Sequence, residues 1–449
     1  MFNLIPLSIF IAIFIPNILT KGLFFDGLTY SSIARNLSQN IGSFWYPHYT
    51  KTLYPNFYEQ PPLGLYIQSL FFRLFGDQYY VEKICSVFFG FLTLLSIYLF
   101  YYRLQSLTKN KISIWVILIL WMFTPVSRYV INNNLLDGLA TPFMLIAGYF
   151  ILSDKKWTNI LGGLFLCISI SVKGLPYMFI IFIPIFFYIL KRNKGTLTSI
   201  LITINTILIF LITAVNFSQT RDFFTYYLNI RIIKSFTEYR VVDNHFFLLR
   251  QLFYELKIPL LISFIILLIT RKINNKKYAI IFFLTGFLGF VPYLLSFVQY
   301  DRYLYPSIIF FIFGLVLVNQ SFFNILENTL IKIKFIKYIF IFVFVIITAV
   351  SLNKMVLNQG KIIDQITLHS NFDELTNTFN KRRVFNVCPT YLIYDWELIA
   401  FLQRYNKISI GIDEKTCFLL TKKNKGCQIP LRCKAFFSSL DFQLYNCQN

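Results

Sequence analysis

Three carboxylates at the edges of apolar segments are the residues best suited to catalysis. Asp26 follows the first apolar segment, and Asp137 opens a later one. Glu59 lies just before the pair Pro61-Pro62 and another apolar run. An ionised carboxylate at the edge of a membrane is costly unless it has a partner or a function. Asp26 is the candidate general base for an acceptor hydroxyl. Asp137 is a candidate for positioning the acceptor or binding sugar hydroxyls, and Glu59 for binding sugar hydroxyls or a divalent ion.

Each of these carboxylates also has a structural alternative. Capping of a helix N-terminus accounts for Asp26 and Asp137. Pairing with a nearby Arg or Lys accounts for Glu59. Capping and catalysis are compatible for Asp26, so the sequence leaves both roles open.

Basic residues near the same edges are candidates for binding a phosphate. Arg302 leads, because a guanidinium between two apolar segments fits a phosphate bidentately. A salt bridge to the preceding aspartate or snorkelling to the membrane interface is its structural alternative. Lys173 interrupts an apolar segment, where an ammonium group needs an anion. Arg240 and Arg128 complete the set of candidate phosphate ligands.

The composition is that of a membrane protein. Of 449 residues, 56% are hydrophobic and only 14% are charged, which soluble domains do not show. The net charge of +22 does not indicate nucleic acid, because many basic residues fall in short clusters between apolar runs. The first twenty residues have no basic region and no small-residue cleavage site. They therefore predict a retained span rather than a signal peptide.

The apolar runs predict an all-α polytopic fold. A membrane-spanning helix needs about 20 apolar residues, and this rule gives about eleven spans. They lie near residues 3–21, 81–102, 112–127, 138–152, 159–172, 175–190, 197–216, 257–270, 278–297, 303–320 and 336–353. The two runs that meet at Lys173-Gly174 are either two spans or one broken helix.

Basic clusters between the spans predict the orientation. Five clusters fall on one face when the N-terminus is cytoplasmic, which agrees with the positive-inside rule. They are Arg103/Lys109/Lys111, Lys155/Lys156, Lys191/Arg192/Lys194, Arg271/Lys272/Lys276/Lys277 and Lys332/Lys334/Lys337. This orientation places the loop 22–80, the loop 217–256 and everything after residue 353 outside the cytoplasm.

The first outer loop is expected to position Asp26. Residues 26–40 have apolar positions at helical spacing (Leu28, Ile33 and Leu37), which predicts a short helix with Asp26 at its N-terminus. Proline and aromatic residues between Trp45 and Tyr58 predict an irregular loop. A further helix begins at the proline pair.

The tail is expected to be a small extracytoplasmic α/β domain of residues 354–449, beside a membrane domain of residues 1–353. VFNVC and KISIGI are typical of strands, and DWELIAFLQRY between them is typical of a helix. In an oxidising compartment, two disulfides with one cysteine left over are expected, with free thiols as the alternative. The tail cysteines are Cys388, Cys417, Cys427, Cys433 and Cys447, and their spacing matches no zinc signature.

Five motifs in order resemble the GT-C membrane glycosyltransferases, in the branch of the bacterial aminoarabinose transferase and the protein O-mannosyltransferases. They are FDGLTYSSIARNL, FYEQPPLGLYIQSLFFRLFGD, NNNLLDGLATPF, VKGLP at 172–176 and DRYLYP at 301–306. The resemblance extends to about residue 310. Two positions depart from the family pattern, because Gly27 stands where Glu is frequent and Gln60 stands where Lys is frequent. If that Lys helps to hold the donor phosphate, another cation does so here or the donor differs.

The resemblance implies a sugar donor linked to polyprenyl phosphate and direct displacement with inversion. Tyr30, Gln60 and Tyr303 lie within its motifs and are the expected substrate-binding residues. The predicted protein is a glycosyltransferase of the bacterial inner membrane with its site facing outward. Its expected acceptor is an envelope lipid or glycan such as lipid A, and protein Ser/Thr is the next choice. A transporter or flippase of lipid-linked saccharide and an inactive relative are the alternatives.

No cofactor is required by this reaction. Glu59 and His245 are the residues that could contribute to a metal site, but one His and one Glu fall short of a usual ligand set. The sequence has no dinucleotide-binding fingerprint, Walker motif or nucleophile elbow, which disfavours a cytoplasmic nucleotide-sugar donor.

Overall fold

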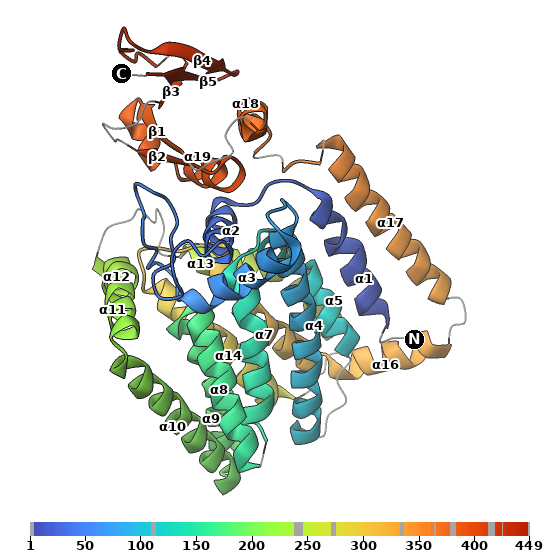
Figure 1. The fold of residues 1–449 in the computed structure, drawn as a ribbon. Coiled ribbons are helices and arrows are strands. Elements are labelled where there is room, and N and C mark those ends of the chain that lie inside the picture. Colours follow the sequence, from blue (N-terminus) through green and yellow to red (C-terminus); the bar gives the residue numbers. More distant parts are fainter. Residues whose placement is uncertain are drawn as a thin grey trace. The chain divides into compact units, whose positions relative to one another are not determined.

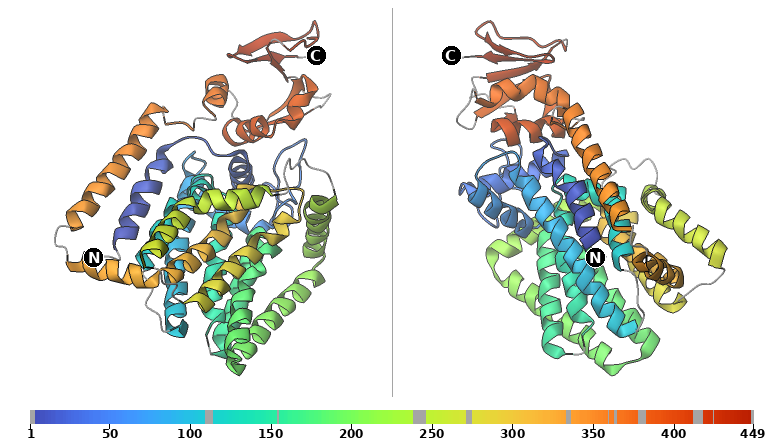
Figure 2. Two further views of the ribbon diagram at one scale, coloured as in Figure 1. Left: turned by 180° about the vertical axis from the view of Figure 1, so that it is seen from behind. Right: turned by 90° about the vertical axis from the view of Figure 1, so that its right-hand side faces the viewer.

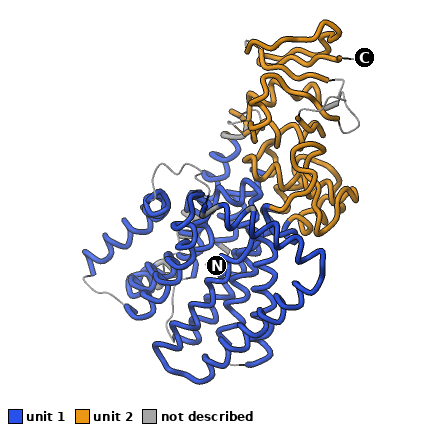
Figure 3. Tube along the Cα trace, turned by 90° about the vertical axis from the view of Figure 1, so that its left-hand side faces the viewer, with its two compact units in different colours: residues 1–17, 59–64, 86–352 blue, residues 18–58, 65–85, 353–449 orange. Residues whose placement is uncertain are grey.

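The computed structural model describes residues 4–108, 114–153, 155–237, 246–270, 275–332, 336–358, 360–362, 365–377, 383–411, 418–423 and 425–447. The chain divides into two compact units (Figure 3). The first unit contains residues 1–17, 59–64 and 86–352, and the second contains residues 18–58, 65–85 and 353–449. The predicted division into 1–353 and 354–449 remains a prediction. The second unit joins the first outer loop to the tail, which the sequence did not suggest.

Helices make up the first unit. They are α1 (Leu4–Phe14), most of α4 (Val81–Thr108), α5 (Ile114–Phe123), α6 (Pro125–Asn132), α7 (Leu136–Ile151), α8 (Lys156–Lys173), η2 (Leu175–Ile181), α9 (Phe182–Lys191), α10 (Lys194–Asn216), α11 (Ser218–Tyr227), the π-helix η3 (Leu228–Ile233), α12 (Lys234–Thr237), α13 (Phe247–Thr270), α14 (Lys276–Leu294), η4 (Asp301–Leu304), α15 (Tyr305–Val318), α16 (Gln320–Lys332) and most of α17 (Ile336–Leu357).

Every predicted span is helical over most of its described residues. Among the described residues, α4, α10, α13, α14 and the run Asp301–Val318 are long and apolar enough to cross a membrane. A sixth span forms if α5 and α6 count as one, since they pass the test together and bend by 69° where Thr124 precedes Pro125. Shorter apolar helices occupy other predicted ranges, including Leu136–Ile151 and Leu175–Lys191. The total of about eleven spans and the orientation remain predictions.

The pair α7 and α8 positions the polar residues of the first unit. In Figures 1 and 2, α8 lies beside α7 and α10, and these pairs make extensive contacts. Gly162 permits the close approach, because a Cβ there would overlap the side chain of Ile151. Since α7 begins next to Asp137 and α8 ends at Lys173, the antiparallel pair brings these two residues to the same end.

The second unit contains α2 (Phe25–Ser38), most of α3 (Pro62–Phe75), α18 (Ile366–Phe372), η6 (Asp373–Asn377), η7 (Thr390–Tyr394), α19 (Trp396–Phe401) and the π-helix η8 (Leu402–Asn406), while η1 (Pro16–Leu19) straddles the boundary between units. The helix predicted after Asp26 is confirmed, with Leu28, Ile33 and Leu37 all buried. The segment between Trp45 and Tyr58 has no regular element, as predicted. The next helix begins at Pro62.

A five-stranded mixed sheet forms the end of the second unit (Figure 1). Its order is β2 (Ile408–Gly411), β1 (Arg383–Cys388), β3 (Phe418–Lys422), β5 (Phe442–Asn446), β4 (Lys434–Ser438). The two predicted strands are β1 and β2, which pair in parallel, and the predicted helix between them is α19 with η8. Disulfides Cys388–Cys427 and Cys433–Cys447 confirm the two expected bridges, and Cys417 lies outside the described residues.

A cluster of titratable groups lies in the second unit around Asp373. Its carboxylate accepts from Lys21 at 2.7 Å and lies 3.0 Å from the Lys361 ammonium and 2.9 Å from His369 Nδ1. Burial opposes the ionisation of Asp373, but the hydrogen bonds from these three groups outweigh it and hold its pKa well below the usual value. Burial also lowers the pKa of His369, against its hydrogen bond to Asp373.

The free energy of unfolding should therefore decrease as the pH is lowered. Unfolded histidine titrates at about pH 6.5 and unfolded aspartate at about pH 3.9. Because both folded pKa values are lower, the unfolded state binds more protons below these values, so stability is lost first through His369 and then through Asp373. We expect the melting temperature in detergent to decrease below about pH 6.5 and His369→Asn to flatten this decrease. Equal pH slopes in the native protein and the variant would contradict this assignment.

Candidate active site

A buried ion pair joins α7 to α8. Lys173 Nζ lies 3.1 Å from Asp137 Oδ2, and their side chains are only 6% and 1% exposed. The hydroxyl of Tyr177 donates to Asp137 Oδ1 at 3.1 Å. The costly ammonium of Lys173 thus has the anion that its apolar surroundings demand, and this anion is one of the predicted catalytic residues.

The break after Lys173 places the neighbouring tyrosines. Gly174 has φ +115° and ψ −178°, a backbone conformation essentially restricted to glycine. A Cβ at this position would overlap the hydroxyl of Tyr227 from α11. The predicted interruption at Lys173-Gly174 is confirmed. It ends α8 at the ion pair and begins η2, which carries Tyr177.

A second, more exposed ion pair lies between Glu59 and Arg231 of η3. The guanidinium Nη1 is 3.8 Å from Glu59 Oε2, and the side chains are 22% and 35% exposed for Arg231 and Glu59. Arg231 Nη2 also donates to the hydroxyl of Tyr303 at 3.2 Å. The ring of Tyr303 stacks on Tyr293, with centroids 4.1 Å apart. Arg231 therefore connects a predicted carboxylate to a predicted substrate-binding tyrosine.

Arg302 brings a second guanidinium to Tyr303. Arg302 is 4% exposed. Its guanidinium carbon lies 4.1 Å from the ring centre of Tyr300 and 5.8 Å from that of Tyr303. Its backbone N–H donates to the Asp301 carboxylate at 2.8 Å. Stacking on aromatic faces is typical of arginine and holds the planar fork in place. Tyr303 therefore contacts two guanidinium groups, of which that of Arg231 is partly accessible.

The two ion pairs belong to one group of residues. Tyr293 on α14 is within electrostatic range of Asp137, Tyr303 and Arg231. Tyr177 is within range of both Asp137 and Tyr293. We call this set the polar cluster. Its members are Glu59, Asp137, Lys173, Tyr177, Tyr227, Arg231, Tyr293, Arg302 and Tyr303.

Other predicted residues lie outside the polar cluster or in the second unit. Gln60 is buried next to Glu59, and Arg128 is exposed on α6. Asp26 is in the first turn of α2, as predicted, and is partly exposed. Tyr30 is buried on the same helix against Phe57. Because α2 belongs to the second unit, the proximity of Asp26 to Asp137 and Arg302 stays a prediction.

Arg240 and the proposed metal ligand His245 lie outside the described residues. In the part of the chain that the structure describes, no group of three or more His, Cys, Asp or Glu side chains could hold a metal ion.

Sequence reasoning missed Arg231, Tyr177, Tyr227 and Tyr293. Arg231 is one of several cations in the segment 217–256, and nothing local separates it from the others. The tyrosines look like members of apolar runs. A usable signal for Tyr177 was its position three residues after the glycine that breaks the apolar run, since a hydroxyl there needs a partner.

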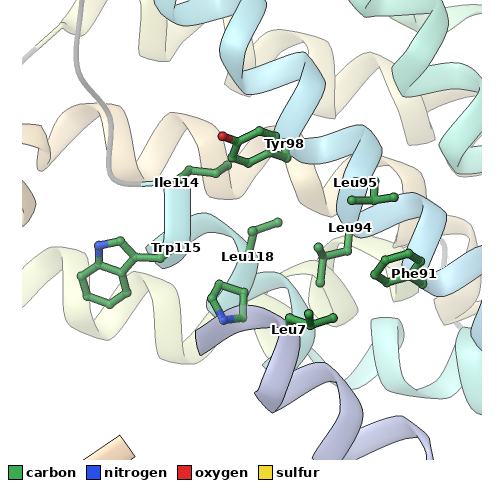
Figure 4. A pocket seen from close by; sticks show the side chains of 9 residues that line it. Leu7, Phe91, Leu94, Leu95, Tyr98, Ile114, Trp115 and Leu118 are labelled. Carbon is green, nitrogen blue, oxygen red and sulfur yellow. The ribbon is translucent and has the colours of Figure 1, made fainter. Parts of the chain in front are cut away.

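An apolar cavity of about 270 Å³ lies between α1, α4 and α5. Figure 4 shows its lining side chains, which come from these three helices: Pro6, Leu7, Phe91, Leu94, Leu95, Tyr98, Ile114, Trp115 and Leu118. Among the described residues, no charged side chain lines this cavity. It is therefore suited to an apolar group and not to a phosphate or a sugar.

Known proteins with related sequence or structure share this architecture. The model of the family described as dolichyl-phosphate-mannose-protein mannosyltransferase matches residues 59–218. ArnT from Cupriavidus metallidurans bound to undecaprenyl phosphate superposes with a TM-score of 0.68 at 11% identity, over 99% of this chain and 97% of that chain. Its apo state gives 0.62 at 13% identity with the same coverage. No curated protein sequence matches the chain significantly.

A more distant structural match is the archaeal oligosaccharyltransferase AglB from Archaeoglobus fulgidus, in complex with an inhibitory peptide and a dolichol-phosphate. It has a TM-score of 0.51 at 10% identity, over 93% of this chain and 69% of that chain. The chain has the fold of the two ArnT structures and, over most of its length, that of AglB. It is an integral membrane protein with a small C-terminal sheet domain. The resemblance drawn from the five sequence motifs is confirmed.

Proposed function

We propose that the protein is a glycosyltransferase that takes a sugar from a polyprenyl-phosphate carrier and transfers it, with inversion, to an envelope lipid or glycan such as lipid A. The GT-C fold and the polyprenyl and dolichol phosphates named in the matching structures support this class of donor. The observation that carries the proposal is the contact of Tyr303 with both Arg231 and Arg302.

The two guanidinium groups suit a phosphate that leaves. As the bond from the sugar to the phosphate breaks, the carrier phosphate gains negative charge, and fixed cations stabilise that charge in the transition state. Arg231 also accounts for Gln60, which stands where related proteins often have Lys. Its guanidinium lies beside the preceding Glu59, so it supplies a cation close to the missing one.

Asp26 is assigned to the acceptor. Its carboxylate takes the proton of an acceptor hydroxyl, and the acceptor oxygen forms a bond to the anomeric carbon on the face opposite the phosphate. The bond from that carbon to the phosphate oxygen breaks, and the bonding pair leaves with the carrier phosphate. An acceptor that is itself a phosphate has no proton to lose, and Asp26 then orients it.

The ends of α7 and α8 support an outward-facing site. Asp137 and Lys173 lie at one end of this antiparallel pair, and Lys155 and Lys156 lie at the connection at the other end. At 1.5 Å per residue, α7 separates these ends by about 24 Å, close to the hydrocarbon thickness of a bilayer. If the lysines are cytoplasmic, Asp137 faces the exterior, which for a bacterial inner membrane is the periplasm.

A purified protein assay tests this function. Defined polyprenyl-phosphate sugars are the donors, and the release of polyprenyl phosphate is measured with and without an acceptor. Arg231→Ala should lower kcat/KM for the donor by about 10²-fold, and Arg231→Lys should restore part of it. Arg250→Ala, an exposed arginine at the start of α13, is the matched control. Native kcat/KM in Arg231→Ala would contradict the phosphate assignment, and no release from any donor would contradict the function.

A protein acceptor is the second candidate. The matching family is described as a protein mannosyltransferase, and the donor chemistry is the same. Parallel reactions with a lipid or glycan acceptor and with Ser/Thr peptides separate the two. A transporter is disfavoured, because it should carry polar groups near mid-helix, whereas Asp137 and Lys173 lie at helix ends.

A further inference from the structure

The tail of the chain, after residue 353, forms hydrogen bonds to the backbone just before α2, the helix that carries Asp26. The side-chain amide of Gln365, only 2% exposed, bonds both backbone groups of Leu23. Its Oε1 accepts from Leu23 N at 3.2 Å, and its Nε2 donates to the Leu23 carbonyl. Lys21 N donates to the Gly360 carbonyl at 2.6 Å nearby. These bonds fix the backbone three residues before Asp26.

The same segment holds the other end of α2. Arg35, in the last turn of this helix, is 0% exposed. Its Nη1 donates to the carbonyl of Arg404 at 2.8 Å, and its Nη2 donates to that of Gln403 at 3.0 Å. A buried guanidinium needs such acceptors. The π-helix η8 presents these two carbonyls to α2.

The loop that follows α2 is bonded to the same part of the tail. Gln403 Nε2 donates to the Tyr49 carbonyl at 2.8 Å. Thr52 Oγ1 donates to the carbonyl of Ile410 in β2 at 2.7 Å, and Ser409 Oγ accepts from Lys51 N at 3.0 Å. The tail thus reaches the residues before α2, its last turn and the loop behind it.

The π-helix η8 is itself anchored by charge. Arg404 is 3% exposed, and its guanidinium lies 2.8 Å from Asp77 and 2.9 Å from Glu82. Two carboxylates on one buried guanidinium make a rigid, geometrically specific contact. The backbone carbonyls of Gln403 and Arg404 are therefore fixed in position, and they accept the hydrogen bonds of Arg35.

The contacts between the tail and α2 include directional hydrogen bonds as well as apolar packing. Apolar packing is non-directional, whereas the hydrogen bonds to Leu23 and Arg35 fix the translation and rotation of α2 at both ends. A displacement of about 1 Å at a reacting group can cost about 10²-fold in rate. We propose that the tail positions α2 and with it the proposed base, with Gln365, Gln403 and Arg404 as the positioning residues for Asp26. This inference rests on the proposed function of Asp26.

Two variants with matched losses test the inference. Gln365→Leu removes both bonds to Leu23. Asn371→Leu removes buried amide bonds to Asp441 and Ser439 in the same unit, without touching α2. Gln365→Leu should lower kcat by about 10²-fold with the donor KM within about twofold of native, and Gln365→Glu, which keeps the acceptor for Leu23 N, should recover part of the rate. Asn371→Leu should keep the native kcat per folded molecule.

Hydrogen exchange of the backbone amides of residues 25–38 gives a readout that does not need turnover. Gln365→Leu should speed this exchange, and Asn371→Leu should leave it native. Thr52→Val, a milder change in the same contact surface, serves if Gln365→Leu does not fold. Native exchange and native kcat in Gln365→Leu would overturn the inference. If the native protein transfers no sugar but Gln365→Leu still speeds the exchange of residues 25–38, the proposed function is overturned and the contact of the tail with α2 stands.

Discussion

Asp26→Asn is expected to lower kcat with a hydroxyl acceptor by about 10²- to 10⁴-fold, the usual contribution of a general base. Asparagine has nearly the same shape and is as good a residue at a helix N-terminus, so α2 should form normally. Asp26 is partly exposed in the first turn of this helix, which gives an acceptor access to it. The donor KM should stay close to native, since Asp26 is not one of the proposed phosphate ligands.

The measurement is single-turnover transfer by the folded variant and the native protein. Asp222→Asn, an exposed carboxylate on α11, is the control for a simple loss of charge. With a phosphate acceptor, which has no proton to give up, the same variant should raise the acceptor KM rather than abolish transfer. Undiminished transfer to a hydroxyl acceptor would remove Asp26 from its assigned role.

The second large effect concerns the buried pair of Asp137 and Lys173. Asp137→Asn alone leaves the ammonium of Lys173 buried without its counter-charge and should destabilise the protein by about 3–5 kcal/mol. The double variant Asp137→Asn/Lys173→Met removes both charges and should regain most of this stability, because replacement of a buried ion pair by neutral groups is often tolerated.

Activity of the double variant separates a structural pair from a working one. We expect it to unfold at close to the native denaturant concentration, yet to transfer sugar at least about 10²-fold more slowly. Denaturant unfolding in detergent and kcat with a defined donor are the two measurements. If the double variant transfers at the native rate, the pair only holds α7 to α8 and Asp137 has no part in the reaction.

Membrane physics made part of the site predictable. A lysine inside an apolar segment requires an anion, and this rule identified Lys173 as a candidate. Asp137 was a candidate because its carboxylate opens an apolar run. The structure pairs these two residues at 3.1 Å. The break at Gly174 was also predictable, since a glycine two residues before Pro176 interrupts an apolar helix.

Other parts of the site depend on contacts that no local pattern encodes. Arg231 reaches Tyr303 across 72 residues of sequence, and the segment around it contains several equivalent cations. Gln365 reaches Leu23 across 342 residues, and no pattern in the sequence of the tail indicated a contact with the first outer loop. In the tail itself, β1 and β2 were predictable from their β-branched residues, whereas β3, β4 and β5, which contain almost no β-branched residues, were not.

The sidedness of the site is the central claim, and accessibility of single cysteines to a membrane-impermeant thiol reagent in intact cells tests it directly. The variants are Asp26→Cys and Glu59→Cys for the site and Lys155→Cys, an exposed residue at the far end of α7 and α8, as the opposite control. Asp26→Cys and Glu59→Cys should react in intact cells, and Lys155→Cys should react only after the membrane is permeabilised. Labelling of Lys155→Cys from outside, with Asp26→Cys and Glu59→Cys protected, would contradict the account.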